Sequence, residues 1–213
     1  MAIPYFVLAG RLMQSGGIAK RLIHLGMALI GWVKGGLGAA TVLTTMFFST
    51  ISGSSSATTA AIGGVMIPEM ERNRYPRAFS ASVVAASGEL GVILPPSVPM
   101  IVYAMLTGTS VAQMFMAGII PGLMIGFSLM ITIIIWSSIK GYGDTQRVTF
   151  GEWFTGVMKA LRAAFLSLML PVLILGGIYG GAFTATEAAV MAVAYAFVVG
   201  TFIYKEISLK ELP

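Results

Sequence analysis

Residues 52–56, with the sequence Ser-Gly-Ser-Ser-Ser, interrupt an otherwise apolar stretch that runs from residue 36 to residue 70. An apolar stretch of this length normally lies in lipid, where every backbone N–H and C=O group has to be paired. A Gly/Ser tract weakens a helix and makes hydroxyls and carbonyl oxygens available as ligands. Membrane proteins tolerate such a break where it is buried or lines a cavity. The tract therefore predicts an ion or solute site inside a membrane protein.

A second break follows at residues 88–99, where two glycines and three prolines exclude a continuous helix. The two breaks offer carbonyl oxygens and Ser/Thr hydroxyls, which suit a dehydrated cation such as sodium. Free helix N-termini beyond each break suit an anionic group of a solute. The alternative is that the small residues only let helices pack closely. A second break with a double proline favours binding over that alternative.

Three further polar residues need an interpretation. Glu89 is a carboxylate in an apolar stretch, where it could bind a cation, take up a proton or pair with a solute amine. It could equally be a solvated residue at a water-filled vestibule, and the sequence leaves both interpretations open. Glu187 follows Thr184 by three positions, which is the spacing of a capping box at a helix start. His24 lies in a basic amphipathic stretch, so we interpret it as interfacial and not as a metal ligand.

The sequence offers no arrangement for catalysis, because it has no nucleophile–His–carboxylate set, no phosphate-binding loop and no metal triad. Zero cysteines exclude disulfides, iron–sulfur clusters and thiolate zinc sites. The 15 methionines are scattered, which indicates packing and not a copper path. The net charge of +5 comes from basic residues at segment ends, which indicates membrane orientation and not nucleic-acid binding. We therefore expect neither an enzyme nor an organic cofactor.

Composition identifies the class of protein independently of the serine tract. Hydrophobic residues make up 57% of the chain and charged residues 10%, and the mean hydropathy is +0.90. Residues 116–139 carry no charge and, at about 1.5 Å per residue, span about 36 Å, enough to cross a hydrocarbon core of about 30 Å. The apolar runs are continuous and do not alternate, which excludes a β-barrel. The sequence predicts an all-α integral membrane protein.

Two topologies are compatible with the apolar arms at residues 36–51 and 58–70, which span only about 24 Å and about 20 Å. One is a single broken span, and the other is a re-entrant hairpin with the serine tract at its tip. Residues 1–35, read as a short helix plus an interfacial amphipathic helix, carry basic residues before the arms, and residues 71–77 carry three arginines after them. The positive-inside tendency places both groups on the cytoplasmic side. We therefore predict a re-entrant hairpin over residues 36–70.

The remaining chain divides in the same way. Residues 71–111 are predicted to form a discontinuous transmembrane helix, and residues 112–213 further transmembrane helices with a cytoplasmic amphipathic helix at about 150–162. This topology brings all 13 basic residues to or near the cytoplasmic face. The chain enters apolar sequence abruptly and without the basic start of a signal peptide, from which we expect a fragment of a longer chain.

Several runs resemble, in family order and over nearly the whole chain, the large membrane subunit of tripartite ATP-independent periplasmic (TRAP) transporters: AIPYFVLAGRLM, FFSTISGSSSATTAAIGGVMIPEM, AASGELGVILPPSVPMIVYAMLTG, MFMAGIIPGLMIG and GGAFTATEAAVMAVAYA. The resemblance implies a multi-pass protein of the bacterial inner membrane that uses a sodium gradient to import a small organic acid, such as a C4-dicarboxylate or sialic acid. It implies two partners, a periplasmic substrate-binding protein and a small four-helix membrane subunit. It also implies an elevator mechanism, in which a transport domain with two re-entrant hairpins moves against a scaffold.

The resemblance also implies roles for individual residues, with residues 52–57 as the tip of the first hairpin. The implied sodium site draws on two side chains and on three backbone positions: Ser49, Ser52, Gly91, Leu94 and Pro96. The implied solute pocket is lined by hydroxyl side chains, to which we add the carboxylate discussed above: Ser54, Ser55, Ser56, Thr58 and Glu89.

Two departures from the family pattern bear on these roles. Family members contain a second, inverted half with its own hairpin, so this sequence corresponds to the first half of an inverted repeat. The family pattern also predicts a small or hydroxyl residue where Glu89 stands. The extra carboxylate conflicts with a simple dianionic solute unless it points away from the pocket.

The alternative from another functional class is an ion channel or a non-transporting membrane scaffold. A channel needs a continuous polar lining. This sequence instead has local breaks flanked by apolar helices. Together with the family resemblance, this observation leads us to predict a sodium-coupled transporter subunit.

Overall fold

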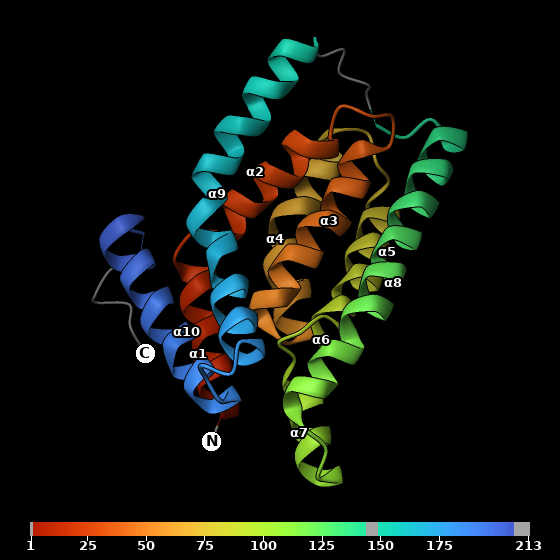
Figure 1. The fold of residues 1–213 in the computed structure, drawn as a ribbon. Helices are drawn as coiled ribbons and strands as arrows, with labels where there is room; N and C mark the ends of the chain where they lie inside the picture. Colours follow the sequence, from red (N-terminus) through yellow and green to blue (C-terminus); the bar gives the residue numbers. More distant parts are fainter. Residues whose placement is uncertain (1, 144–148, 207–213) are drawn as a thin grey trace.

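The computed structural model describes residues 2–143 and 149–206, which are helical and contain no β-strand (Figure 1). The helices are α1 (Ala2–Ser15), α2 (Ile18–Ile30), α3 (Gly36–Ser52), α4 (Ser55–Arg72), α5 (Arg77–Gly88), α6 (Leu90–Ile93), α7 (Val98–Thr107), α8 (Val111–Lys140), α9 (Phe150–Tyr179), α10 (Ala185–Val198) and the π-helical η1 (Val199–Ile203).

Four helical segments are long and apolar enough to cross a membrane: Arg77–Thr107, Val111–Lys140, Phe150–Tyr179 and Ala185–Ile203. Their outer faces expose large apolar side chains, as at Ile120 and Ile139 on α8, which are 68% and 72% exposed. A continuous apolar surface of this kind is favourable against lipid and unfavourable against water. The prediction of an all-α integral membrane protein is confirmed.

Helices α3 and α4 form an antiparallel hairpin whose two free ends lie at the same end of the molecule as the end of α8 and the start of α9 (Figure 1). The turn between them consists of Gly53 and Ser54 alone. Gly53 has a φ of 61°, a conformation that glycine adopts without steric cost, and its N–H donates to the Ser49 carbonyl. Ser55 and Ser56 already belong to α4, so the tip is shorter than residues 52–57.

The segment Arg77–Thr107 is broken twice, at Glu89 and at residues 94–97, and so consists of α5, α6 and α7. Pro95 and Pro96 lack the N–H groups that would continue α6. Ser97 starts α7, because its Oγ accepts from the Met100 N–H at 3.5 Å and donates to the Val92 carbonyl at 2.7 Å. The break is thus held by hydrogen bonds and is not a loose loop.

Helix α9 is continuous from Phe150 to Tyr179, where the sequence predicted an amphipathic helix at about 150–162 followed by a separate span. A capping box of Thr149 and Glu152 starts this helix, and Pro171, although it lacks an N–H to donate, does not end it. The capping box predicted at Thr184 and Glu187 is confirmed, since the Thr184 N–H donates to the Glu187 carboxylate at 2.8 Å.

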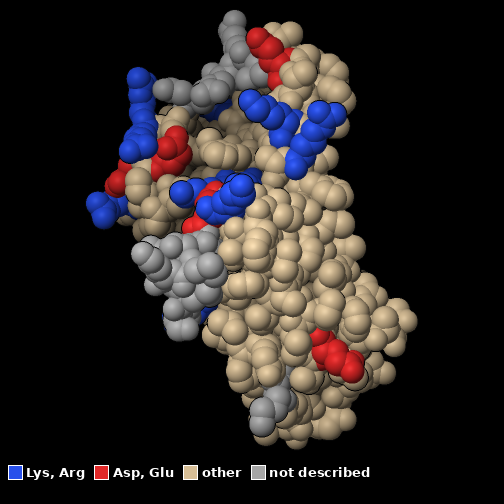
Figure 2. All heavy atoms as spheres, turned by 90° about the vertical axis from the view of Figure 1, so that its left-hand side faces the viewer, with Lys and Arg blue, Asp and Glu red and all other residues tan. Residues whose placement is uncertain are grey.

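Basic side chains gather toward the end of the molecule that holds the free ends of the hairpin. On the face shown in Figure 2, Lys and Arg lie in the upper half, and the surface below them is almost uncharged. Five of the described basic residues lie at or beside the end of α2, the end of α4, the start of α5 and the end of α8 at this end: Lys34, Arg72, Arg74, Arg77 and Lys140. This is the distribution on which the topology prediction depended.

Candidate functional site

The hairpin tip and the break before α7 are in direct contact. The Val98 N–H donates to the Gly53 carbonyl at 3.1 Å. A Cβ placed on Gly53 would lie only 2.9 Å from the Pro96 carbonyl oxygen. On the other side of the tip, a Cβ on Gly91 would lie 2.7 Å from the Ser54 carbonyl oxygen. The two breaks therefore form one site, in which glycine allows the backbones to approach closely.

Two buried hydroxyls at this site have no hydrogen-bond partner. Ser49 Oγ on α3 and Thr58 Oγ1 on α4 are both in fully buried side chains, and neither makes a hydrogen bond among the described residues. A buried hydroxyl without a partner costs about 1 to 3 kcal/mol. An ordered water, an ion or a ligand would each remove this cost.

The structure brings most of the residues predicted for sodium to the tip. Ser49 and Ser52 form the last turn of α3, and Ser52 Oγ donates to the Ser54 carbonyl at 3.2 Å. Gly91 and the Pro96 carbonyl face the tip from the second break. The predicted set thus comes from two separated segments that contact each other.

Leu94, also predicted for sodium, has a different environment. Its side chain is buried against α8, where a Cβ on Gly122 would lie 2.6 Å from it. Its N–H donates to the Leu90 carbonyl at 2.8 Å. Only the Leu94 backbone carbonyl is therefore a candidate ligand, as the prediction stated.

The residues predicted for the solute lie in two places. Ser54 and Ser55 are half-buried and Ser56 is exposed, and the hydroxyls of Ser54 and Ser56 are 3.2 Å apart. Thr58 is instead buried, and its Oγ1 would lie 2.9 Å from a Cβ on Gly91. Thr58 therefore lies on the inner side of the tip with the predicted sodium residues, whereas the serines are on the open side.

Glu89 is exposed at the junction of α5 and α6 and makes no ion pair within the described part of the chain. The preceding residue, Gly88, contacts Ser55 and Thr59 on α4. The structure shows no hydrogen bond between the Glu89 carboxylate and the tip serines. Glu89 is therefore close in sequence to the site but not joined to its hydroxyls.

Sequence reasoning missed a buried hydroxyl pair next to the site, in which Ser87 Oγ on α5 donates to Thr45 Oγ1 on α3 at 3.3 Å. It also missed Ser97, whose hydroxyl connects α6 to α7. The signal for Ser97 was present, because a serine immediately before a helix that has proline in its first turn is a strong N-cap candidate. No comparable signal distinguishes Ser87 from other small residues of α5.

The atoms at the tip that could coordinate a cation are uncharged carbonyl and hydroxyl oxygens. Among the described residues there is no group of His, Cys, Asp and Glu side chains that could hold a metal ion. Broken helices that meet at a carbonyl- and hydroxyl-rich point within a bundle of membrane spans are typical of secondary transporters.

Comparison with known proteins identifies the family. Residues 1–213 match the family model described as the tripartite ATP-independent periplasmic transporter, DctM component. The chain belongs to this family, a class of membrane permeases and not of enzymes.

The relatives are named for different solutes. The C4-dicarboxylate TRAP transporter large permease protein DctM of Pseudomonas aeruginosa is 46% identical over 213 residues, covering 100% of this chain and 49% of the relative. The 2,3-diketo-L-gulonate TRAP transporter large permease protein YiaN of Escherichia coli is 40% identical, covering 100% and 49%. The sialic acid TRAP transporter large permease protein SiaM of Vibrio cholerae is 38% identical, covering 99% and 48%. The chain spans about half the length of these relatives.

Proposed function

We propose that this chain forms the first half of the solute and sodium site of a TRAP transporter that imports a small organic acid across the bacterial inner membrane. The observation that carries the proposal is the contact between the hairpin tip and the proline-rich break, with the unpartnered hydroxyls of Ser49 and Thr58 beside it. The names of the relatives, a C4-dicarboxylate, a sugar keto-acid and sialic acid permease, support an organic acid as the solute class.

The proposed sodium ligands are Ser49, Ser52 and the backbone carbonyls around Gly91, Leu94 and Pro96. Two features support this assignment. Sodium prefers oxygen ligands, and the inner side of the tip presents oxygens from both breaks. Ser49 Oγ in addition has no partner that a sodium ion would have to replace. Thr58, which lies on the same inner side, joins this group in our proposal.

The proposed solute side is the open side of the tip. Ser54, Ser55 and Ser56 lie at the start of α4, whose first N–H groups carry the positive end of the helix dipole. A solute carboxylate is favoured at this position. We propose that the Glu89 carboxylate points away from the bound acid, which removes the conflict with an anionic solute.

The proposed cycle needs partners. A periplasmic binding protein delivers the acid, a small four-helix membrane subunit completes the scaffold, and an inverted second half supplies the other side of the solute pocket. The hairpin α3–α4 enters and leaves the membrane from the cytoplasmic side and moves with the broken segment α5–α7 as a transport domain. Closure of the tip around both ligands then couples solute import to the inward sodium gradient, because solute and sodium each stabilise the closed state.

The test is solute uptake by the complete transporter in proteoliposomes, with succinate and sialic acid as probes. We expect uptake that needs both an inward sodium gradient and the binding protein. Uptake that persists when potassium replaces sodium would contradict the coupling. Conduction that needs no binding protein and does not saturate would identify the alternative, an ion channel.

A further inference from the structure

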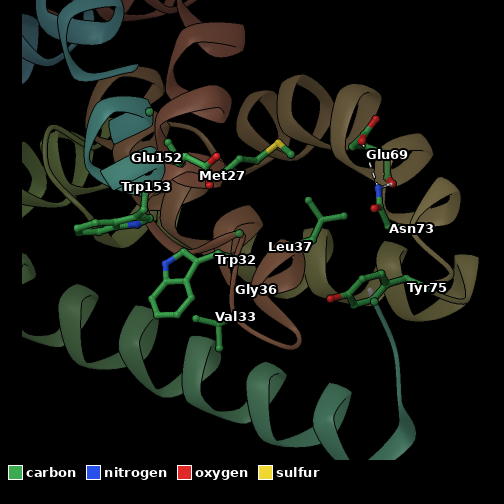
Figure 3. A pocket seen from close by; sticks show the side chains of 14 residues that line it. Met27, Trp32, Val33, Gly36, Leu37, Glu69, Asn73, Tyr75, Glu152 and Trp153 are labelled. Carbon is green, nitrogen blue, oxygen red and sulfur yellow. Dashed lines mark hydrogen bonds between the residues drawn. The ribbon is translucent and has the colours of Figure 1, made fainter. Parts of the chain in front are cut away.

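A separate cavity of about 240 Å³ lies at the end of the molecule where the hairpin begins and ends, away from the tip (Figure 3). Glu152 and Trp153 reach it from α9, and Glu69 and Asn73 reach it from the end of α4 (Figure 3). The end of α2 and the start of α3 form the wall between them. The cavity therefore joins the base of the hairpin to α2 and α9.

The charge of this cavity is opposite to that of its surroundings. The chain has a net charge of +5, and three arginines lie in residues 71–77 beside the cavity. The described lining nevertheless contains two carboxylates, Glu69 and Glu152, and no Lys or Arg. The Glu69 carboxylate has two partners among the described residues, Arg72 Nη1 at 3.5 Å and Asn73 Nδ2, which donates to it at 3.2 Å, and the Arg72 side chain is 78% exposed. An exposed pair of this kind contributes little, so the lining favours a cation.

Aromatic rings and unpartnered polar groups complete the lining. Trp32, Trp153 and Tyr75 contribute ring systems, and a hydrogen bond from Trp32 Nε1 to the Leu29 carbonyl at 3.2 Å fixes the first of them. The Tyr75 side chain is only 3% exposed, and its hydroxyl, which faces the Gly38 backbone and the Ser137 side chain, completes no hydrogen bond of good geometry within the described structure. Trp153 Nε1 is a buried donor that likewise has no partner there. Burial raises the pKa of the Tyr75 hydroxyl, so it remains protonated at neutral pH.

The combination specifies a ligand class. Carboxylates with aromatic faces bind organic ammonium groups by charge and by cation–π attraction. The free N–H of Trp153 needs an acceptor on the same ligand, and the Tyr75 hydroxyl can donate to it as well. Hydroxyl groups and phosphate esters next to an ammonium group supply such an acceptor. A bare inorganic cation would leave the aromatic rings and Trp153 unused.

We propose that this cavity binds a small organic ammonium group that carries a hydrogen-bond acceptor, of the 2-aminoethanol type. The ammonium lies in the cavity that Glu69 and Glu152 line from opposite sides (Figure 3), and the acceptor receives the Trp153 N–H. The bound group links the base of the hairpin to α9. A free amino alcohol and the headgroup of phosphatidylethanolamine share this chemistry.

The test is a titration of the complete protein with ethanolamine, in which calorimetry measures the binding. The protein is held in nanodiscs of phosphatidylglycerol, and empty nanodiscs are the blank. We expect saturable binding that weakens about tenfold or more in the double variant Glu69→Gln, Glu152→Gln, since one charge-assisted hydrogen bond contributes about 1.5 to 3 kcal/mol. Glutamine retains the capping function of Glu152, so α9 still starts at the same residue. Tyr75→Phe is a second variant, which we expect to weaken binding while it preserves the ring.

The matched control is Glu187→Gln, because Glu187 is the acid of the other capping box and is remote from the cavity. We expect this variant to bind ethanolamine like the wild type. Addition of phosphatidylethanolamine to the nanodiscs distinguishes the two sources: loss of the ethanolamine signal assigns the site to the lipid headgroup, and retention assigns it to a soluble amine. Absence of saturable binding, equal binding by the double variant, equal weakening in the control, or competition by inorganic phosphate would each overturn the proposal.

Discussion

At the scale of single residues, the buried hydroxyls of Ser49 and Ser52 illustrate two different roles within one turn of α3. Ser52 Oγ already donates to the Ser54 carbonyl, so it stabilises the tip without any ligand. Ser49 Oγ is buried without a partner, so the protein alone gains nothing from it. The two serines therefore predict different consequences for the same substitution.

We expect Ser49→Ala to leave the unfolding temperature unchanged or slightly raised in sodium-free buffer, because it removes an unsatisfied buried hydroxyl. In the same variant, the rise in unfolding temperature on addition of sodium should shrink, since a lost ligand weakens sodium binding by about tenfold. Thermal unfolding with and without sodium measures both effects. Ser82→Ala, at an exposed position of α5, is the control; an unchanged sodium response in Ser49→Ala would remove Ser49 from the ion site.

At the scale of elements, the sequence predicted which segments break but not how they meet. Gly/Ser and Pro residues mark both breaks because they weaken or forbid the helical ladder locally. Their contact through Val98 N–H and the Gly53 carbonyl is a backbone interaction between distant segments, which no local pattern encodes. The position of Thr58 on the inner side of the hairpin tip could not be predicted from the sequence either, since it depends on where α4 starts.

The tip predicts a matched pair of glycine substitutions. Gly53→Ala places a Cβ 2.9 Å from the Pro96 carbonyl at a φ of 61°, and a left-handed conformation costs a non-glycine residue about 1 to 2 kcal/mol. Gly176→Ala on α9 meets no atom within 4 Å, and it gains about 0.5 to 1 kcal/mol of helix stability. We therefore expect unfolding temperatures to fall in the first variant and to rise or stay level in the second. A Gly53→Ala protein as stable and as active as the wild type would contradict the close contact.

At the scale of the whole molecule, the charge distribution and the helix directions agree on one arrangement. The two free ends of the hairpin, the end of α8 and the start of α9 share one end of the molecule, and the turn between α7 and α8 lies at the opposite end (Figure 1). The sequence predicted this arrangement from the positions of basic residues. It could not predict the cavity at the hairpin base, which needs four elements to be placed relative to one another.

The absence of cysteine in this sequence allows a direct test of the topology. We expect a membrane-impermeant maleimide to label Lys34→Cys and Arg72→Cys from the cytoplasmic side, because both lie at the free ends of the hairpin. Thr109→Cys, in the exposed turn before α8, should react only from the periplasmic side. Labelling of Lys34→Cys and Arg72→Cys from opposite sides would replace the hairpin with a single broken span.

The hydrogen bond from Val98 to Gly53 uses no side-chain atom. A substitution of a hydroxyl side chain on the open side of the tip therefore removes no atom of this joint. The backbone joint between the two breaks and the side chains that line the tip can thus change at different rates in evolution. A protein built this way can change the side chains that line its tip while the backbone joint between the two breaks is retained.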